Sequence, residues 1–386
     1  MNNISLKKLL LITMILWLTP SIASASLYEE CYDSISDVSD KDSTEVDSVK
    51  TNKRNVFGWV SNMLSSFNDI DENYIEPNHY LFTVMLQGTY TYDLYKINSN
   101  NHRTQSMSFA PDGIFKLGPY LGWKFIFGGY TFTLGSSSYD KTKTEIDLSF
   151  YTSRLGIDLF YRRTGSDYKL RNAKLGPNIN TQPLEDVPFD GFSAGITGFN
   201  LYYIFNHRHF SYPAAFAQST CQKISCGSWL AGIGYTKNSL DLDYVKLQSL
   251  IDERLNKNVA QLDSGLMFKS ARYYDINVSA GYAYNIVFAK NMLFCASGQL
   301  ALAYKKSVGE TEGDSNDSHF SFSKINPNII GRFGLVYNNT LWYAGASAII
   351  RSNYYFNSRF STNNTFGNMY LYVGYNFGLK KKYRKK

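Results

Sequence analysis

Apolar and polar residues alternate with a period of two over most of the chain from Tyr80 onward. In the first stretch, residues 80–94, large apolar side chains such as Phe82 and Leu86 fall on one face, and polar side chains such as Thr83 fall on the other. This is the period of a β-strand, in which successive side chains point to opposite faces. The pattern therefore predicts strands with one apolar face and one polar face.

The same alternation places charged residues on the polar face of several strands. Ile146 alternates with Glu145 and Asp147, and a later stretch carries Asp275 and Asn277 at polar positions. Charged groups on one face of an otherwise apolar strand require water on that side. The alternation therefore predicts a sheet that encloses a wet lumen.

Long polar loops and short turns separate the predicted strands in alternation. Long loops on one side and short turns on the other are typical of outer-membrane β-barrels, and an even strand number puts both chain ends in the periplasm. We therefore predict an all-β fold, a transmembrane antiparallel β-barrel of about twelve strands at residues 77–379, with a short N-terminal periplasmic segment. The alternative, a soluble β-sandwich or helical β repeat, would leave the aromatic outer faces without a partner. The predicted strands are residues 80–95, 114–122, 125–134, 143–152, 155–163, 191–205, 222–236, 271–286, 292–305, 320–337, 340–352 and 366–379.

The residues before the barrel predict export. Two lysines precede an apolar run at residues 9–18, and a small-x-small triplet follows at residues 23–25, so residues 1–25 are predicted to be a cleaved signal peptide. The apolar run is too short to span a bilayer as a helix, which takes about 20 residues. Residues 26–76 are acidic and are predicted to be partly disordered in the periplasm, with a short amphipathic helix at 56–67 that plugs or caps the barrel mouth.

The composition agrees with a barrel. The chain has 31 Tyr and 26 Phe, and its charged fraction is 18%, below the roughly 25% of soluble proteins. The net charge of +7 is concentrated in the basic tail at residues 380–386. This tail is either a solvated end to the last strand or a contact with anionic lipid head groups or an acidic partner, and a nucleic-acid partner is not expected for an exported chain.

Seven strings of residues carry a resemblance to a known family, and they are, in order, Tyr74–Pro77, Met85–Gln87, Phe115–Lys124, Gly129–Phe132, Tyr203–Asn206, Phe210–Phe216 and Gly227–Ser228. Through these strings the chain resembles the bacterial outer-membrane proteins called domain of unknown function 4421. The resemblance covers residues from about 70 to 379, and it implies a membrane barrel of about twelve strands with no assigned activity. Independently of these strings, the last strand carries an aromatic residue, Phe377, close to its end at Leu379, and this resembles the signal read by the barrel-assembly machinery.

Residues 206–221 form an unusually long connection on the predicted periplasmic side. His207, His209 and Ser211 can share one face of a strand, and a His that activates a Ser hydroxyl is the pairing used by hydrolases. Pro213 favours a bent turn instead. Three interpretations remain: a catalytic cluster, a ligand or partner contact, and a structural turn that folds into the barrel mouth. The predicted turn motif comprises Asn206, Arg208, Phe210, Tyr212 and Pro213.

The inward polar residues are candidates for lining the lumen or binding a ligand. In a narrow barrel such charges usually fill the interior as ion pairs, and the alternative is a selective pore. Cys221 and Cys226 form either a periplasmic disulfide or two independent small residues. The sequence predicts no metal site and no cofactor, because it lacks zinc-ligand spacing and phosphate-binding loops. The inward candidates are Lys116, Lys124, Glu145, Asp147, Asp158, Arg162, Asp275 and Asn277.

Three functional hypotheses follow from the sequence. The first is a non-enzymatic outer-membrane barrel, either a small channel or a structural or surface barrel in contact with membrane lipids. The second is a lipid hydrolase or acyltransferase that uses the His and Ser residues of the long connection. The third is a component of a surface assembly with a periplasmic or surface protein partner, which rests on the acidic segment and the basic tail.

Overall fold

The computed structural model describes residues 69–100, 105–123, 126–134, 144–165, 167–255, 260–307 and 325–384. The predicted signal peptide, the acidic segment up to residue 68 with its candidate helix at 56–67, Lys124, and the last two lysines lie outside the described residues. No helix among the described residues is long and apolar enough to cross a membrane.

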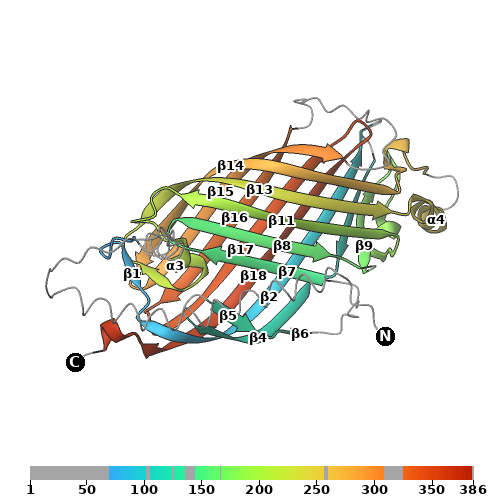
Figure 1. The fold of residues 1–386 in the computed structure, drawn as a ribbon. Coiled ribbons are helices and arrows are strands. Elements are labelled where there is room, and N and C mark those ends of the chain that lie inside the picture. The colour runs from blue at the N-terminus through green and yellow to red at the C-terminus, as the bar shows by residue number, and fades with distance from the viewer. Residues whose placement is uncertain are drawn as a thin grey trace, which may run out of the picture. The chain divides into compact units, whose positions relative to one another are not determined.

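The described residues form mainly one large, curled, antiparallel sheet of 16 strands (Figure 1). Along the sheet the strands follow the order β10-β9-β3-β2-β18-β17-β16-β15-β14-β13-β11-β8-β7, and β4 pairs with β2, β5 and β6. A separate two-stranded sheet joins β1 to β12. The strands are β1 (Ile75–Pro77), β2 (Tyr80–Ser99), β3 (Ser106–Pro111), β4 (Ile114–Trp123), β5 (Ile126–Gly129), β6 (Phe132–Leu134), β7 (Thr144–Tyr151), β8 (Leu155–Arg163), β9 (Tyr168–Lys174), β10 (Val187–Pro188), β11 (Phe192–Ile204), β12 (Thr220–Gln222), β13 (Cys226–Leu242), β14 (Ser270–Ala289), β15 (Met292–Ser307), β16 (Ile325–Asn338), β17 (Trp342–Phe356) and β18 (Phe360–Leu379).

Each of the twelve predicted strands has a counterpart in this sheet. The predicted strand at 125–134 is divided into β5 and β6, which pair with different parts of β4 on either side of Pro119. A proline has no N–H to donate to a ladder, and its carbonyl accepts the bond from the N–H of Tyr130, one of the two residues between β5 and β6. The division therefore falls opposite the proline.

Three of the loops predicted from the sequence contain further structure. The loop at 96–113 holds β3, the loop at 164–190 holds β9 and β10, and the loop at 237–270 holds a helix. The extra strands are short and lie beyond the alternating stretches, so the period of two did not identify them. The helical elements are η1 (Gln182–Leu184), α3 (Tyr212–Phe216), α4 (Tyr244–Leu255), η2 (Ser264–Leu266) and η4 (Lys381–Tyr383).

The predicted division into an apolar and a polar face is present along the strands. On β14, Ile276 and Val278 are 62% and 61% exposed on the outer face, whereas Asp275 and Asn277, which alternate with them, are 0% and 4% exposed. Burial of the polar side chains and exposure of the apolar ones is the reverse of a soluble protein's arrangement.

The strands of the large sheet that come first and last in the sequence, β2 and β18, pair with each other. β2 and β18 are in register from Tyr80 opposite Leu379 to Ser99 opposite Phe360. The sheet is therefore continuous from β18 to β2. At one end of the strand order, β7 pairs with β8 alone among the strands that the structure describes.

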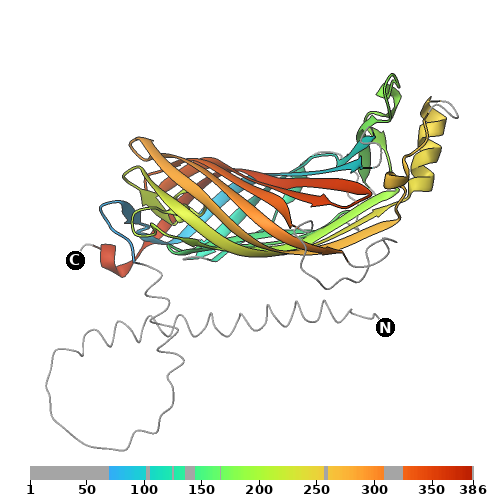
Figure 2. The same cartoon turned by 90° about the horizontal axis from the view of Figure 1, so that it is seen from above.

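Two apolar clusters lie at opposite ends of the sheet, one at the end where α4 lies and the other at the end where α3 lies. Figures 1 and 2 show these two ends. At the α4 end, β3, β9, β10, α4, η1 and η2, which we call the cap, bury a core that includes Phe109 and Phe192. At the α3 end, residues 205–225, which we call the plug, fold inward and bury Phe210 and Tyr212 against the strands. Polar side chains occupy the inner face between these two clusters.

Candidate functional site

A group of ion pairs occupies the interior between the plug and the cap. The amine of Lys116 on β4 lies 3.1 Å from a carboxylate oxygen of Glu145 on β7. A guanidinium nitrogen of Arg162 on β8 lies 2.7 Å from a carboxylate oxygen of Asp147 on β7. The structure thus brings together four of the inward candidates in two pairs.

Asp158 is the fifth inward candidate, and two arginines that sequence reasoning missed hold it. The carboxylate of Asp158 on β8 accepts a hydrogen bond from Arg332 on β16 and lies 3.3 Å from a guanidinium nitrogen of Arg351 on β17. The side chains of Asp158 and Arg332 are both 0% exposed. The period of two marks both arginines as inward, so the signal was present in the sequence.

Aromatic rings cover these arginines. Arg332 lies over the ring of Tyr202 with its central carbon 4.7 Å from the centroid, and Arg351 lies 5.2 Å from the ring centroid of Phe160. Such cation–π contacts partly replace the water that a buried guanidinium loses.

The side chains of this group cross the interior of the curled sheet. β8 and β16 are separated in the strand order by β11, β13, β14 and β15, yet Asp158 and Arg332 are in direct contact. Arg162 also donates to the backbone carbonyls of Tyr92 on β2 and Gly367 on β18. We call Asp147, Asp158, Arg162, Arg332 and Arg351 the charge network.

The remaining inward candidates form a smaller group nearer the cap. The amide of Asn277 donates to the carboxylate of Asp275 at 3.2 Å. Buried Lys305 donates to Asn328 at 3.4 Å and to the backbone carbonyl of Tyr354. One carboxylate oxygen of Asp275 has no hydrogen-bond partner among the described residues.

The plug brings the candidate catalytic residues near one another without joining them. The Ser211 hydroxyl accepts from the N–H of Ala214 at 3.2 Å, so it caps α3, and it lies 2.8 Å from the hydroxyl of Thr220. His209 instead faces Asn206 at 3.2 Å and Asp71 at 3.4 Å. Among the described residues, no hydrogen bond links Ser211 to either candidate histidine.

The other residues of the predicted turn motif are structural neighbours of this segment. Phe210 and Tyr212 are fully buried in the plug core, and Pro213 lies in the first turn of α3. Arg208 faces Asp69 at 3.4 Å, and His207 packs edge-on to Tyr203.

Hydrogen bonds attach the plug to the surrounding strands. The hydroxyl of Tyr212 lies 2.5 Å from that of Ser297 on β15, and Gln218 donates to the hydroxyl of Tyr372 on β18 at 2.7 Å. The amide of Asn285 on β14 donates to the carbonyl of Ser211 at 2.9 Å. The plug is thereby bonded to three separate parts of the wall.

Cys221 and Cys226 are free thiols in this structure. Cys221 lies on β12 opposite Glu76, whereas Cys226 begins β13 opposite Asn285. In this structure the two residues stand as independent thiols in different sheets, which is the second of the two alternatives that the sequence leaves open. Burial raises the pKa of the Cys221 thiol to about 12, which keeps it in the unreactive thiol form.

A cavity of about 400 Å³ lies between the plug and the charge network. Strands β2, β4, β7, β17 and β18 form its wall, and the end of the plug forms its floor. Three inward candidates from the sequence, Lys116, Glu145 and Asp147, line it.

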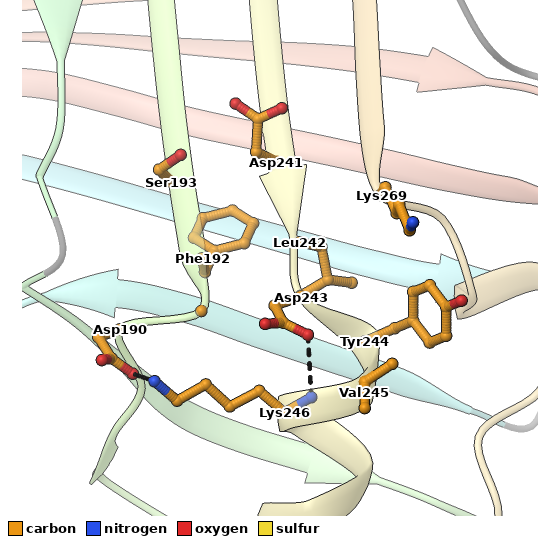
Figure 3. Close-up of a pocket in the computed structure, with 11 residues that line it drawn as sticks. Asp190, Phe192, Ser193, Asp241, Leu242, Asp243, Tyr244, Val245, Lys246 and Lys269 are labelled. Carbon is orange, nitrogen blue, oxygen red and sulfur yellow. Dashed lines mark hydrogen bonds and ion pairs between the residues drawn. The ribbon is translucent and has the colours of Figure 1, made fainter.

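A second hollow, a surface cleft of about 470 Å³, lies in the cap beside the start of α4 (Figure 3). Lys246 extends from α4 to Asp190 with 2.6 Å between the amine and the carboxylate. This hydrogen bond holds the pKa of Asp190 below its usual range. Asp243 accepts from the backbone N–H of Lys246 at 3.0 Å and so caps the helix. The polar groups of this cleft therefore serve the local fold.

Solved structures similar to this chain include several outer-membrane proteins. The outer membrane protease OmpT from Escherichia coli shares 7% identity over 78% of this chain and 97% of that chain, with a TM-score of 0.30. The toluene transporter TodX from Pseudomonas putida shares 10% identity over 77% and 90% of the two chains, with a TM-score of 0.20. The transport unit of the autotransporter AIDA-I from Escherichia coli shares 12% over 83% and 98%, with a TM-score of 0.22. Scores this low carry no argument about activity.

No curated protein matches the sequence. The family model described as "Domain of unknown function (DUF4421)" matches residues 69–377, which include nearly all of the sheet, the plug, the cap and the charge network. The chain therefore belongs to the DUF4421 family, as the resemblance in its sequence indicated.

Proposed function

We propose that this protein is a non-conducting, non-enzymatic barrel of the outer membrane, in which the curled sheet closes around a filled lumen and presents the cap at the cell surface. The observation that carries the proposal is the charge network, which crosses the interior between the apolar cluster of the plug and that of the cap. A structural or surface role fits this arrangement better than a channel.

The outer face of the sheet supports a membrane location. Large apolar side chains are exposed in rows along the strands, and a patch of this size on a soluble protein would cause aggregation. At the α3 end, Trp342 packs on Tyr375 with centroids 4.6 Å apart, and Phe82 stacks on Phe377 at 5.5 Å. Aromatic residues at the ends of strands are typical of the membrane–water interface.

The filled interior argues against a permanent pore. Asp158 and Arg332 are fully buried and bonded to each other across the lumen. Removing one partner of such a pair costs about 3–5 kcal/mol, because the other charge is left without compensation. Ions therefore cannot displace the network without a large loss of stability.

Planar-bilayer recordings of the purified full chain test this function. Insertion is first verified by heat-dependent mobility on a gel and by a β-rich circular dichroism spectrum. We then expect no conductance steps, because the plug, the network and the cap core lie in series. A steady open-state conductance would overturn the proposal in favour of a channel.

The hydrolase hypothesis has its own test in detergent. If the long connection were catalytic, the wild-type protein would hydrolyse phospholipids, and Ser211→Ala and His209→Ala would each abolish that activity. We expect no hydrolysis by the wild-type protein, because the Ser211 hydroxyl already caps α3.

A further inference from the structure

The lumenal cavity combines two kinds of lining. Met85, Phe216 and the rings of Tyr343 and Tyr372 form its apolar part near the plug. Gln87, Thr89 and Asn368 supply uncharged hydrogen-bonding groups toward the charge network. Its volume of about 400 Å³ falls within the usual range for small-ligand sites, about 300–1,000 Å³.

The charged groups that line the cavity are already paired. Lys116 is matched by Glu145 at 3.1 Å, and Asp147 is matched by Arg162 at 2.7 Å. A charged ligand would have to break one of these pairs, whereas an uncharged hydrogen-bonding group would not. The lining therefore favours an uncharged head group.

The plug and the charge network bound the cavity along the axis of the sheet. Phe216 and Gln218 form the plug side, and Gln218 is bonded to the wall at Tyr372. On the other side, Asn368 lines the cavity and accepts a hydrogen bond from Arg162 of the network at 3.0 Å. Entry along the axis would require one of these to move.

The side of the cavity formed by β7 reaches the outer face of the sheet. Leu148 also lines the cavity, although its side chain is 47% exposed at an outward position of β7. In the part of the chain that the structure describes, β7 is hydrogen-bonded to β8 alone, and the Lys116–Glu145 ion pair links it to β4. The cavity and the surroundings of the barrel wall thus meet beside Leu148.

We propose that this cavity binds one uncharged amphipathic molecule taken from the membrane, with its head group among Gln87, Thr89 and Asn368 and its hydrocarbon chain leaving past Leu148. The proposal rests on the membrane location proposed above. The apolar part of the lining then contacts the upper chain, and the hydroxyl and amide groups satisfy the head group in a site where an unsatisfied polar group would be costly.

Photo-crosslinking with a monoacylglycerol tests this site. The probe carries a diazirine next to its glycerol head group, and the full-length protein is irradiated in lipid nanodiscs and mapped by mass spectrometry. We expect labels on inward residues of β2 and β18, and we expect excess unlabelled monoacylglycerol to suppress them at least tenfold. Labels confined to outward residues would overturn the proposal.

Two matched substitutions on the inner face sharpen the result. Ser347→Trp fills the cavity, because Ser347 lines it, and should reduce inward labelling at least tenfold. Ser279→Trp introduces the same ring on β14, at a position that does not line the cavity, and should leave the labelling unchanged. Equal labelling in both folded variants would also overturn the site.

The measurements separate this proposal from the one it rests on. A chain that stays soluble and shows no heat-dependent mobility removes the membrane barrel itself. A chain that inserts normally but gives non-saturable labelling removes the cavity site alone. If Ser347→Trp does not fold, suppression by unlabelled monoacylglycerol in the wild-type protein still decides.

Discussion

The plug and the cap lie at opposite ends of the same sheet, and different interactions attach each of them to it. The plug is a single connection between β11 and β13, and three of its attachments to the wall are the hydrogen bonds that join Tyr212 to Ser297, Gln218 to Tyr372 and Ser211 to Asn285. The cap gathers several segments far apart in the sequence around packed rings. Within it, Phe109 stacks on Phe192 with centroids 4.5 Å apart, and Tyr168 meets Phe192 edge-on at 4.7 Å.

This difference predicts unequal strength. A hydrogen bond replaces bonds to water and contributes about 0.5–1.5 kcal/mol, whereas truncating a buried aromatic ring costs about 3–5 kcal/mol. The plug also packs the rings of Phe210 and Tyr212 against each other and against Tyr202. The comparison of strength therefore concerns its polar attachments to the wall, each of which is separately weak. We expect the cap to remain folded under changes that loosen the plug.

The largest effect is expected for Phe192→Ala in the cap core. Phe192 is fully buried among three rings, so the cap should lose about 3–5 kcal/mol of stability. Hydrogen exchange of β9 and α4 measures the loss. Phe199→Ala is the matched control on the same strand, because Phe199 faces outward and is 39% exposed, and it should leave cap exchange unchanged. Equal exchange in the two variants would show that the rings do not hold the cap.

A smaller effect is expected for Tyr212→Phe in the plug. The change removes the hydroxyl that pairs with Ser297 and should cost about 1 kcal/mol. The rate of hydrogen exchange in residues 205–225 should rise, while the cap keeps its protection. Planar-bilayer recordings of the variant should still show no conductance steps. Tyr203→Phe, at an outward position of β11 with 38% exposure, serves as the control. A simultaneous loss of cap protection would mean that the two ends are coupled.

The smallest effect concerns pH at the base of the cap. Asp112 lies 2.7 Å from Lys169 and 2.8 Å from Arg171, and hydrogen bonds from these two residues lower the pKa of Asp112. A lowered folded-state pKa stabilises the fold above the unfolded value of about 3.9 and loses that contribution as pH falls through the folded value. For an exposed pair the contribution is at most about 1 kcal/mol.

Hydrogen exchange of β3 and β9, corrected for intrinsic rates, checks this dependence. Protection should be constant from about pH 7 to pH 5 and should fall below about pH 4. Asp112→Asn should lower the protection at neutral pH and flatten the profile in the acidic range. An unchanged profile in the variant would exclude Asp112 as the cause.

The period of two identified the strands and their inner faces, because a strand's side-chain geometry is local. It marked Asp158 and Arg162 as inward, and the same parity applies to Arg332. It did not reveal that Asp158 meets Arg332, since curvature decides which strands face each other across the lumen. That information lies in the whole sheet and not in any one stretch.

Local signals also explain what was missed in the cap. Leu247, Ile251 and Leu255 recur every four residues and are buried on one face of α4, a spacing that predicts a helix. The polar composition of residues 237–270 predicts a long loop, and the helical spacing of three residues inside it is too short a signal to outweigh that composition. The contacts of Phe192 join segments more than eighty residues apart, and no local pattern reports them.

The pairing of β2 with β18 has a consequence for biogenesis. Within the large sheet, β18 is the last strand along the chain, and it is the neighbour of β2, the first, with Phe82 opposite Phe377. Contacts so distant along the chain form slowly, because a long loop must close before they contribute. Until the 20 residues of β18 have paired, β2 and β17 each have an unpaired edge that can pair with other chains.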